Sequence, residues 1–285
     1  MELIIGKYSG FCNGVKYTVD CARNLLDNNI IYSLGDIVHN EIVINELKSK
    51  GLIVKNSIDE IPNNSKVIIR AHGEIVDTYK KAKEKNIELI DLTCGKVKLI
   101  HNKILNKNNC FVIIIGKKNH PETIAHKSYS NNSFVIESID EVKNAYDNYL
   151  NSGKNMVYVV AQTTFNSDLF DKIVDNIKEV FNTNIYVDKT ICNATSIRQN
   201  ETKEIAKVVN KMIIIGGKNS SNTKELAIIA KEYCNNTFLI QTSKDLDKEM
   251  FNNNDIIGIT AGASTPEEVI NDVVDYLDSI YKKRK

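Results

Sequence analysis

Short apolar runs alternate along the chain with longer segments of mixed apolar and polar residues. The run at residues 3–5 is followed by a segment in which Val15, Val19 and Leu26 recur at helical spacing. Short apolar runs that end in polar loops are typical of strands in parallel sheets, and helical spacing is typical of the helices that cover them. The pattern therefore predicts an α/β fold with small, mostly parallel sheets flanked by helices.

One order of elements occurs three times, starting at Cys12, Cys94 and Cys192. Each copy is expected to run helix, strand, helix, strand, strand, helix and strand, although the third lacks its closing strand and cysteine. Residues 1–12 contain both, so we expect the N-terminal strand to complete the third unit. The predicted units are residues 13–94, residues 95–192, and residues 193–285 with strand 1–12.

Each of the three repeat cysteines is expected to end a strand and begin a helix. A helix N-terminus stabilises negative charge and favours the thiolate form that binds metals. If the three units surround one axis, the thiolates of Cys12, Cys94 and Cys192 converge there. Three sulfur ligands suit a [4Fe–4S] cluster with one iron left open for substrate, or a zinc ion with an open position. We interpret the other cysteines as packed apolar residues: Cys21, Cys110 and Cys234.

Two further strand ends in each repeat carry polar residues. The first set comprises His39 and Asn40, His120 and Glu122, and Ser220, Ser221 and Asn222. The second set comprises His72, Gln162, Thr163 and Thr164, and Gly262, Ser264 and Thr265. Ligands of parallel sheets bind at the carboxyl ends of the strands, and hydroxyl and backbone N–H groups at helix starts favour anions. We therefore predict that these loops bind a phosphate group.

Glu122 is the only carboxylate among these loops, and it follows His120 and Pro121 directly. In a site rich in hydrogen-bond donors, a carboxyl group is the natural proton source. His101 and His126 lie farther along the expected helices, and we place both outside the predicted site.

Composition narrows the class of protein. The formal net charge of +1 gives no electrostatic reason to expect binding to nucleic acid or to a membrane surface. No apolar run approaches the ~18 residues of a membrane span, and the N-terminal residues do not resemble a signal peptide. We therefore expect a cytoplasmic protein whose cysteines are reduced thiols or metal ligands.

A set of motifs along the chain carries a family resemblance. They are GFCNGV, GDIVHN, RAHG, DLTC, NHPE, AQTT, TICNATSIRQ, NSSNT and ITAGAST, in this order. Together they are highly specific, and the chain resembles the LytB-type family of 4-hydroxy-3-methylbut-2-enyl diphosphate reductases over essentially its whole length. The resemblance implies a trefoil of three pseudo-symmetric α/β units around an oxygen-sensitive central [4Fe–4S] cluster.

The resemblance also implies roles for individual residues, carried over motif by motif. It implies that the cluster is held by Cys12, Cys94 and Cys192. It implies that the diphosphate is held by His39, His72, His120, Ser220, Ser221, Asn222 and Ser264. Thr163 and Glu122 would serve the substrate hydroxyl and its proton. Gly95 departs from the proline that the family has after the second cysteine, and we expect a less rigid corner there.

The activity that this resemblance implies is the two-electron reductive dehydroxylation of an allylic diphosphate. The products would be isopentenyl and dimethylallyl diphosphate, made in the final step of the non-mevalonate pathway. Electrons would come from reduced ferredoxin or flavodoxin. Two other classes use the same thiolates: a zinc-dependent hydrolase of a phosphorylated substrate, and a non-enzymatic iron–sulfur redox sensor. The sensor has no need for the Ser-Ser-Asn and His-Pro-Glu loops, and metal analysis distinguishes the hydrolase.

Overall fold

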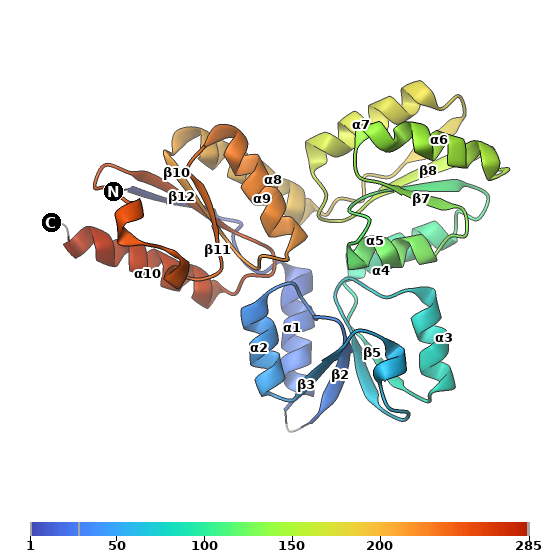
Figure 1. Ribbon diagram of the computed structural model, residues 1–285, viewed down its shortest axis with the longest axis horizontal. Helices are drawn as coiled ribbons and strands as arrows, with labels where there is room; N and C mark the ends of the chain where they lie inside the picture. The colour runs from blue at the N-terminus through green and yellow to red at the C-terminus, as the bar shows by residue number, and fades with distance from the viewer. Residues whose placement is uncertain (1, 28, 284–285) are drawn as a thin grey trace. The chain divides into compact units, whose positions relative to one another are not determined.

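The computed structural model describes residues 2–27 and 29–283 (Figure 1). Within these ranges the strands form three sheets of four parallel strands each. Every sheet is built from strand–helix alternation, as the repeating pattern of the sequence predicts.

The first sheet contains β2 (Ile31–Leu34), β3 (Leu52–Lys55), β4 (Lys66–Ile69) and β5 (Glu88–Asp91). Their spatial order is β3–β2–β4–β5, and all neighbours pair in parallel. The helices of this region are α1 (Asn13–Leu25), α2 (Glu41–Ser49) and α3 (Val76–Glu84), with a 3₁₀ turn, η1, at Ile58–Glu60. Val67 and Ile69 point to one face of β4, where they share a buried cluster with Ala82 of α3.

The second sheet contains β6 (Phe111–Ile115), β7 (Ser133–Ile136), β8 (Met156–Ala161) and β9 (Asn184–Val187), in the order β7–β6–β8–β9. Its helices are α4 (Gly95–Leu105), α5 (Pro121–Ser128), α6 (Val142–Asn151) and α7 (Ser167–Val180), with a 3₁₀ turn, η2, at Ile139–Glu141. β6 is buried on both faces: Ile113 and Ile115 belong to one apolar cluster, and Val112 and Ile114 belong to another. Such continuous apolar strands are typical of parallel sheets covered on both sides.

The third sheet contains β10 (Lys211–Ile215), β11 (Thr237–Ile240), β12 (Ile256–Ala261) and β1 (Glu2–Ile5). Its helices are α8 (Asn193–Val208), α9 (Ser221–Tyr233) and α10 (Glu267–Lys283), with 3₁₀ turns η3 (Ser243–Asp245) and η4 (Lys248–Met250). The strand order is β11–β10–β12–β1, and β1 pairs in parallel with β12. β1 therefore occupies the place that β5 and β9 occupy in the other sheets, and the predicted α/β class with three similar units is confirmed.

The described residues divide into two compact units. The first unit comprises the chain up to residue 16, residues 38–45 and the chain from residue 193 onward, and it holds the third sheet. The second unit comprises residues 17–37 and 46–192, and it holds the first and second sheets. The domain boundaries expected at residues 94 and 192 stay predictions.

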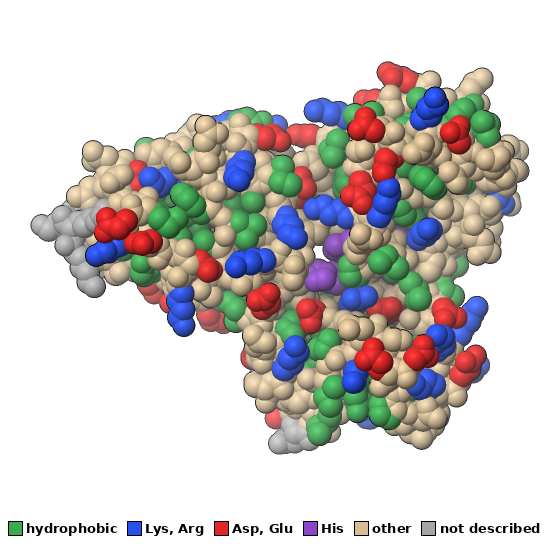
Figure 2. All heavy atoms as spheres, viewed as in Figure 1, with side chains coloured by type: hydrophobic (Ala, Val, Ile, Leu, Met, Phe, Trp, Pro, Cys, Tyr) green, Lys and Arg blue, Asp and Glu red, His purple; other side chains and the backbone are tan. Residues whose placement is uncertain are grey.

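Two further observations concern the hydropathy of the helices and the distribution of surface charge. Among the described helices, none combines the length and the hydropathy that a membrane span requires. Figure 2 shows acidic and basic side chains intermixed on the visible face, as expected for a chain whose formal net charge is +1.

Candidate functional site

The three repeat cysteines occupy equivalent local positions. Cys12, Cys94 and Cys192 directly precede α1, α4 and α8, and each side chain is half-buried. The backbone N–H of each cysteine donates to the carbonyl oxygen of the second residue after a strand. The acceptors are Ala263 after β12 at 3.1 Å, Ala71 after β4 at 3.0 Å, and Thr163 after β8 at 3.0 Å. The same hydrogen bond thus fixes each corner between a strand end and a helix start.

The corner before α4 forms without the proline that the resemblance led us to expect. α4 begins at Gly95, directly after Cys94. A Cβ atom at Gly95 would meet no atom within 4 Å, so the glycine is not required by close packing.

Helix α8 holds the loop that leads to Cys12. The guanidinium group of Arg198 donates to the carbonyl oxygens of Tyr8 at 2.7 Å and Gly10 at 2.8 Å. The carboxylate of Glu201 accepts the N–H groups of Lys7 at 2.7 Å and Tyr8 at 3.0 Å. Arg198 is buried, so its charge is neutralised by these carbonyl dipoles in a setting where charge-assisted hydrogen bonds are strong.

In the second unit, Glu122 and Thr163 are joined by two hydrogen bonds. Glu122 lies in the first turn of α5 and is only 2% exposed. One carboxylate oxygen, Oε1, accepts the N–H of Thr163 at 2.6 Å, and the other, Oε2, accepts the hydroxyl of Thr163 at 2.8 Å. The pair is linked to the third corner, because the carbonyl of Thr163 accepts the N–H of Cys192.

Two histidines of the predicted set stand beside this pair. His120 caps α5, where its Nδ1 accepts the N–H of Glu122 at 3.2 Å. The rings of His72 and His120 meet edge to face, with centroids 5.3 Å apart. The second unit therefore brings four predicted residues into contiguous contact: Glu122, Thr163, His120 and His72.

A buried histidine that the sequence analysis left out also faces Glu122. His126 is fully buried on α5, and its Nε2 lies 3.3 Å from Glu122 Oε1. The two residues are four positions apart on one helix, so they share a face. This spacing is the sequence signal that identifies His126, whereas attention to the strand ends alone misses it.

The surroundings of Glu122 set its charge. Burial by itself raises the pKa of the Glu122 carboxyl, but the nearby imidazole of His126, the charge of His120 and the N–H of Thr163 lower it. The net pKa is below the ordinary value of 4.5, so Glu122 is ionised at neutral pH.

A second buried histidine, His101 of α4, packs on His126. Its ring contacts that of His126 edge to face, with centroids 5.0 Å apart, and stacks on Tyr129 with centroids 4.1 Å apart. Burial, followed by the charge of His126, lowers the pKa of His101 to about 3, so this ring is neutral. The loop after β4 packs directly on it: Gly73 has φ +78°, and a Cβ atom there would lie 2.6 Å from the ring.

The first unit holds the predicted hydroxyl and amide groups. Ser220 caps α9, its hydroxyl accepting the N–H of Thr223 at 3.2 Å, and Ser221 and Asn222 follow as buried residues of the first turn. Asn222 is only 4% exposed, yet neither its amide oxygen nor its amide nitrogen has a hydrogen-bond partner among the residues that the structure describes. Ser264 donates its hydroxyl to the backbone carbonyl of His39 at 3.3 Å. Buried amides are normally paired, so Asn222 stays a candidate for contact with a ligand.

The predicted site residues thus form two groups. The first unit contains Cys12, His39, Ser220, Ser221, Asn222 and Ser264. The second unit contains Cys94, Cys192, His72, His120, Glu122 and Thr163. The convergence of the two groups on one axis stays a prediction. Among the cysteines that we assigned to packing, Cys110 and Cys234 are buried and Cys21 is half-buried.

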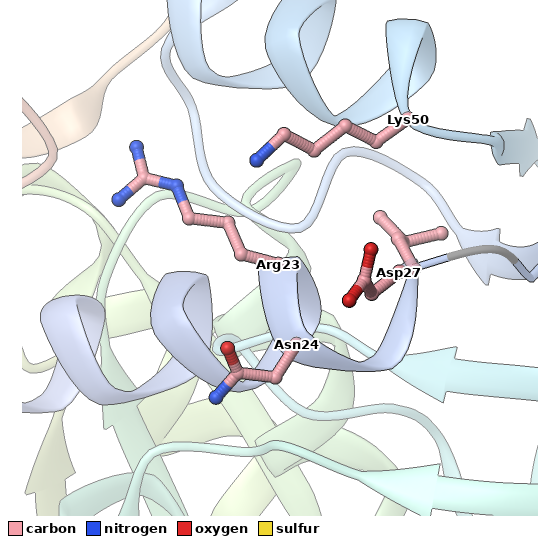
Figure 3. A pocket seen from close by; sticks show the side chains of 5 residues that line it. Arg23, Asn24, Asp27 and Lys50 are labelled. Carbon is pink, nitrogen blue, oxygen red and sulfur yellow. The ribbon is translucent and has the colours of Figure 1, made fainter.

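A pocket of about 790 Å³ lies away from these groups, at the opposite end of α1 from Cys12. Figure 3 shows its lining side chains, which come from Arg23, Asn24, Leu26, Asp27 and Lys50. The guanidinium of Arg23 bonds the Glu46 carboxylate at 2.7 Å, and Lys50 lies 3.3 Å from the same group. Because both cations already face a carboxylate, this pocket is a poor candidate for the anion site.

Comparison with known proteins decides the family. The family model described as LytB protein matches residues 3–278. The chain belongs to the LytB family. Curated relatives of this LytB chain carry the name 4-hydroxy-3-methylbut-2-enyl diphosphate reductase. The protein from Clostridioides difficile is 38% identical over 98% of this chain and 100% of its own. The protein from Campylobacter hominis is 39% identical over 98% and 100%.

Solved structures agree with this assignment. The LytB chain is similar to the E-1-hydroxy-2-methyl-but-2-enyl-4-diphosphate reductase of Plasmodium falciparum, with a TM-score of 0.90 and 30% identity over 97% of this chain and 87% of that one. It is also similar to a structure described as (E)-4-hydroxy-3-methyl-but-2-enyl diphosphate reductase, the terminal enzyme of the non-mevalonate pathway. There the TM-score is 0.68 and the identity 36%, over 98% of this chain and 99% of that one.

Proposed function

We propose that this LytB chain reduces (E)-4-hydroxy-3-methylbut-2-enyl diphosphate to isopentenyl and dimethylallyl diphosphate, the terminal step of the non-mevalonate pathway. One observation carries the proposal beyond the family likeness. The buried carboxylate of Glu122 is held by both the N–H and the hydroxyl of Thr163, and the carbonyl of Thr163 holds the backbone of Cys192. A proton-transferring group is thus joined through one residue to a predicted cluster ligand.

The donor set fits an iron–sulfur cluster. Cys12, Cys94 and Cys192 stand at equivalent helix starts, where thiolates are favoured, and three thiolates suit a [4Fe–4S] cluster with one iron free of protein ligands. When bound, such a cluster supplies electrons one at a time and a Lewis-acidic iron. We assign the electron donor to reduced ferredoxin or flavodoxin and the location to the cytoplasm.

The diphosphate would bind at the start of α9. The N-terminal turn of a helix offers backbone N–H groups and a favourable dipole to an anion. The unpaired amide of Asn222 adds a buried donor, and Ser220, Ser221 and Ser264 add hydroxyls. We add His39, His72 and His120 as donors to the same group. Binding would orient the substrate hydroxyl toward Glu122 and Thr163.

Glu122 and Thr163 would handle the proton that the leaving oxygen requires. Replacing the allylic hydroxyl by hydrogen consumes two electrons and two protons and releases one water. Thr163 positions the substrate hydroxyl against the Glu122 carboxyl, which transfers a proton to it as the C–O bond breaks. Because both oxygens of Glu122 are bound by Thr163, the carboxyl keeps one orientation throughout.

The test is turnover of the allylic diphosphate by anaerobically purified protein with an artificial reductant, together with iron, sulfide and zinc analysis. We expect about four irons and four sulfides per chain. Glu122→Gln should retain them and lower kcat by roughly 100-fold or more, because general acid catalysis is lost. Glu74→Gln is the matched control, since Glu74 is also buried in the second unit but pairs with Arg70. Zinc in place of iron, or near-normal turnover in Glu122→Gln, would contradict the proposal.

A further inference from the structure

His126 is a buried titratable group that the proposed reaction leaves without a task. Its side chain is fully buried, and its Nε2 lies 3.3 Å from Glu122 Oε1. Neither ring nitrogen makes a hydrogen bond of normal geometry with another described residue. A wholly buried imidazole without neutral partners is costly unless it pairs with a charge, so the facing carboxylate explains its place.

The state of Glu122 creates the need for such a partner. The pKa of its carboxyl lies below the ordinary value, so at neutral pH this group carries no proton to give. Oε2 faces the Thr163 hydroxyl, and Oε1 faces the Thr163 N–H and the His126 ring. An amide N–H does not release its proton, whereas an imidazolium does.

His120 also lowers the pKa of Glu122, but its Nδ1 accepts the backbone N–H of Glu122 and does not face the carboxylate. The groups around His126 itself do not compete with it. His101 of α4 touches its ring, and Tyr129, at the end of α5, stacks on His101. Asp91 and Lys98 act on His101 with opposite effects on its charge, and burial keeps that ring neutral. His101 therefore adds no second positive charge beside His126.

We propose, resting on the proposed function, that His126 is a positioning residue that holds the Glu122 carboxylate and hands it a proton in each turnover. The N–H bond of the imidazolium breaks, the O–H bond of Glu122 forms, and the two opposite charges cancel. The O–H bond then breaks as the substrate oxygen takes the proton. The C–O bond cleaves with electrons from the one-electron donor, and water leaves. One of the two protons of the reaction is accounted for in this way, and His126 regains a proton from solvent before the next turnover.

The first experiment is the pH profile of kcat for the holoenzyme and for His126→Gln. Without the cationic neighbour, burial dominates and raises the pKa of Glu122 in the variant. The variant therefore keeps kcat within about threefold of wild type at pH 6, where Glu122 takes its proton from water, and loses roughly tenfold or more at pH 8. KM and iron content should stay within about twofold. His101→Gln, which changes a buried ring without touching the carboxylate, should follow the wild-type profile.

The second experiment reads the proton directly. The chain has five histidines, so 15N-histidine NMR of the oxidised holoenzyme gives few signals. At pH 7 we expect an imidazolium signal that is absent from His126→Gln and that turns neutral in Glu122→Gln. A neutral His126 in wild type, or an unchanged pH profile in His126→Gln, would overturn the inference. Absence of turnover in wild type would instead remove the proposed function, and the NMR signal would still report whether Glu122 and His126 share a proton.

Discussion

Asn222 is the residue whose surroundings most favour contact with a ligand in the proposed site. Its amide is buried in the first turn of α9 and has no hydrogen-bond partner on either atom. Leaving such a group unpaired costs about 1–3 kcal/mol, so the residue lowers the stability of the chain without ligand. A residue that lowers stability in this way is expected at a site where a bound ligand completes the hydrogen bonds of that residue.

Replacing Asn222 should therefore weaken binding rather than folding. Asn222→Ala should raise KM for the allylic diphosphate by roughly 10- to 100-fold, since a hydrogen bond to a charged group contributes about 1.5–3 kcal/mol. The melting temperature should stay equal or rise. Steady-state kinetics and thermal unfolding check both. Asn148→Ala is the control, because Asn148 is exposed and bonds only a carbonyl of its own helix. An unchanged KM would remove Asn222 from the diphosphate site.

His101 makes a prediction for stability against pH. Its ordinary pKa of 6.5 falls to about 3 in the folded chain. Between these values the unfolded chain binds more protons, so stability declines as pH falls below about 6.5. One such group contributes up to about 1.4 kcal/mol per pH unit. The melting temperature of His101→Gln should therefore fall less between pH 7 and pH 5 than that of wild type, and equally between pH 9 and pH 7. If the melting temperatures of wild type and His101→Gln fell equally between pH 7 and pH 5, His101 would be charged in the folded chain, and the prediction would be wrong.

For single residues, the sequence predicts which residue types lie near the strand ends better than it predicts which groups they contact. Glu122 and Thr163 were identified from the ends of strands, and the structure places them in direct hydrogen bonds. His126 was missed because it lies inside a helix, where only the helical period reveals that it faces Glu122. The amide of Asn222 lacks hydrogen-bond partners because of the atoms that pack around it from elsewhere in the fold. A local sequence pattern does not contain this information.

Among the elements, α8 has a task beyond covering its sheet. Its side chains Arg198 and Glu201 bind four backbone groups of the loop that leads to Cys12. A loop with few apolar contacts depends on such bonds for its conformation. The position of Cys12 is therefore set by a helix that begins directly after Cys192.

Removing this support should expose the first cysteine. Arg198→Met keeps the length of the side chain but leaves two carbonyls without their donor. We expect alkylation of the Cys12 thiol in cluster-free protein, followed by peptide mass spectrometry, to become roughly tenfold faster. Iron content after reconstitution should fall by about half or more. Lys207→Met is the control on the same helix, since Lys207 is exposed and contacts Glu204 and the ring of Tyr233 instead of the loop. Equal alkylation rates in wild type and Arg198→Met would show that the loop keeps its conformation without Arg198.

The order of elements could be predicted apart from α6, which lies between β7 and β8 where the repeat predicts that one strand follows another. Elsewhere each apolar run has the length of a strand and each amphipathic segment that of a helix. The support of the loop before Cys12 by helix α8 could not be predicted from the sequence. The TICNATSIRQ segment contains Arg198, but its partners are carbonyl oxygens, which every residue has and no sequence pattern distinguishes.

On the scale of the whole molecule, the third sheet joins the two ends of the chain. β1 lies along β12, with Glu2 opposite Ile256 and Ile5 opposite Ile259. The pairing gives this sheet the four-strand order of the others and leads directly into the loop that carries Cys12. The repeat in the sequence predicted this strand, whereas periodicity does not encode where the three units lie relative to one another.

Deleting residues 2–5 should damage the first unit and spare the second. The edge of β12 loses its partner, so its amide protons should exchange with deuterium at least tenfold faster. The protein should also bind less iron, because the chain before Cys12 is no longer anchored. Protection of β6 and β8 should not change. Ile5→Ser is the control, since Ile5 is 48% exposed and keeps the backbone pairing. Full protection of β12 after the deletion would show that β1 adds nothing to the sheet.

The place of β1 also has a consequence for biosynthesis. During synthesis β1 has to wait for its partner, because Ile256 of β12 is made long after Glu2 of β1. Pairing between segments so far apart is slow, and an unpaired strand is exposed to aggregation in the meantime. The first cysteine corner therefore reaches its final form only after β12 has been synthesised. We expect assembly of the proposed cluster to follow the synthesis of β12 for the same reason.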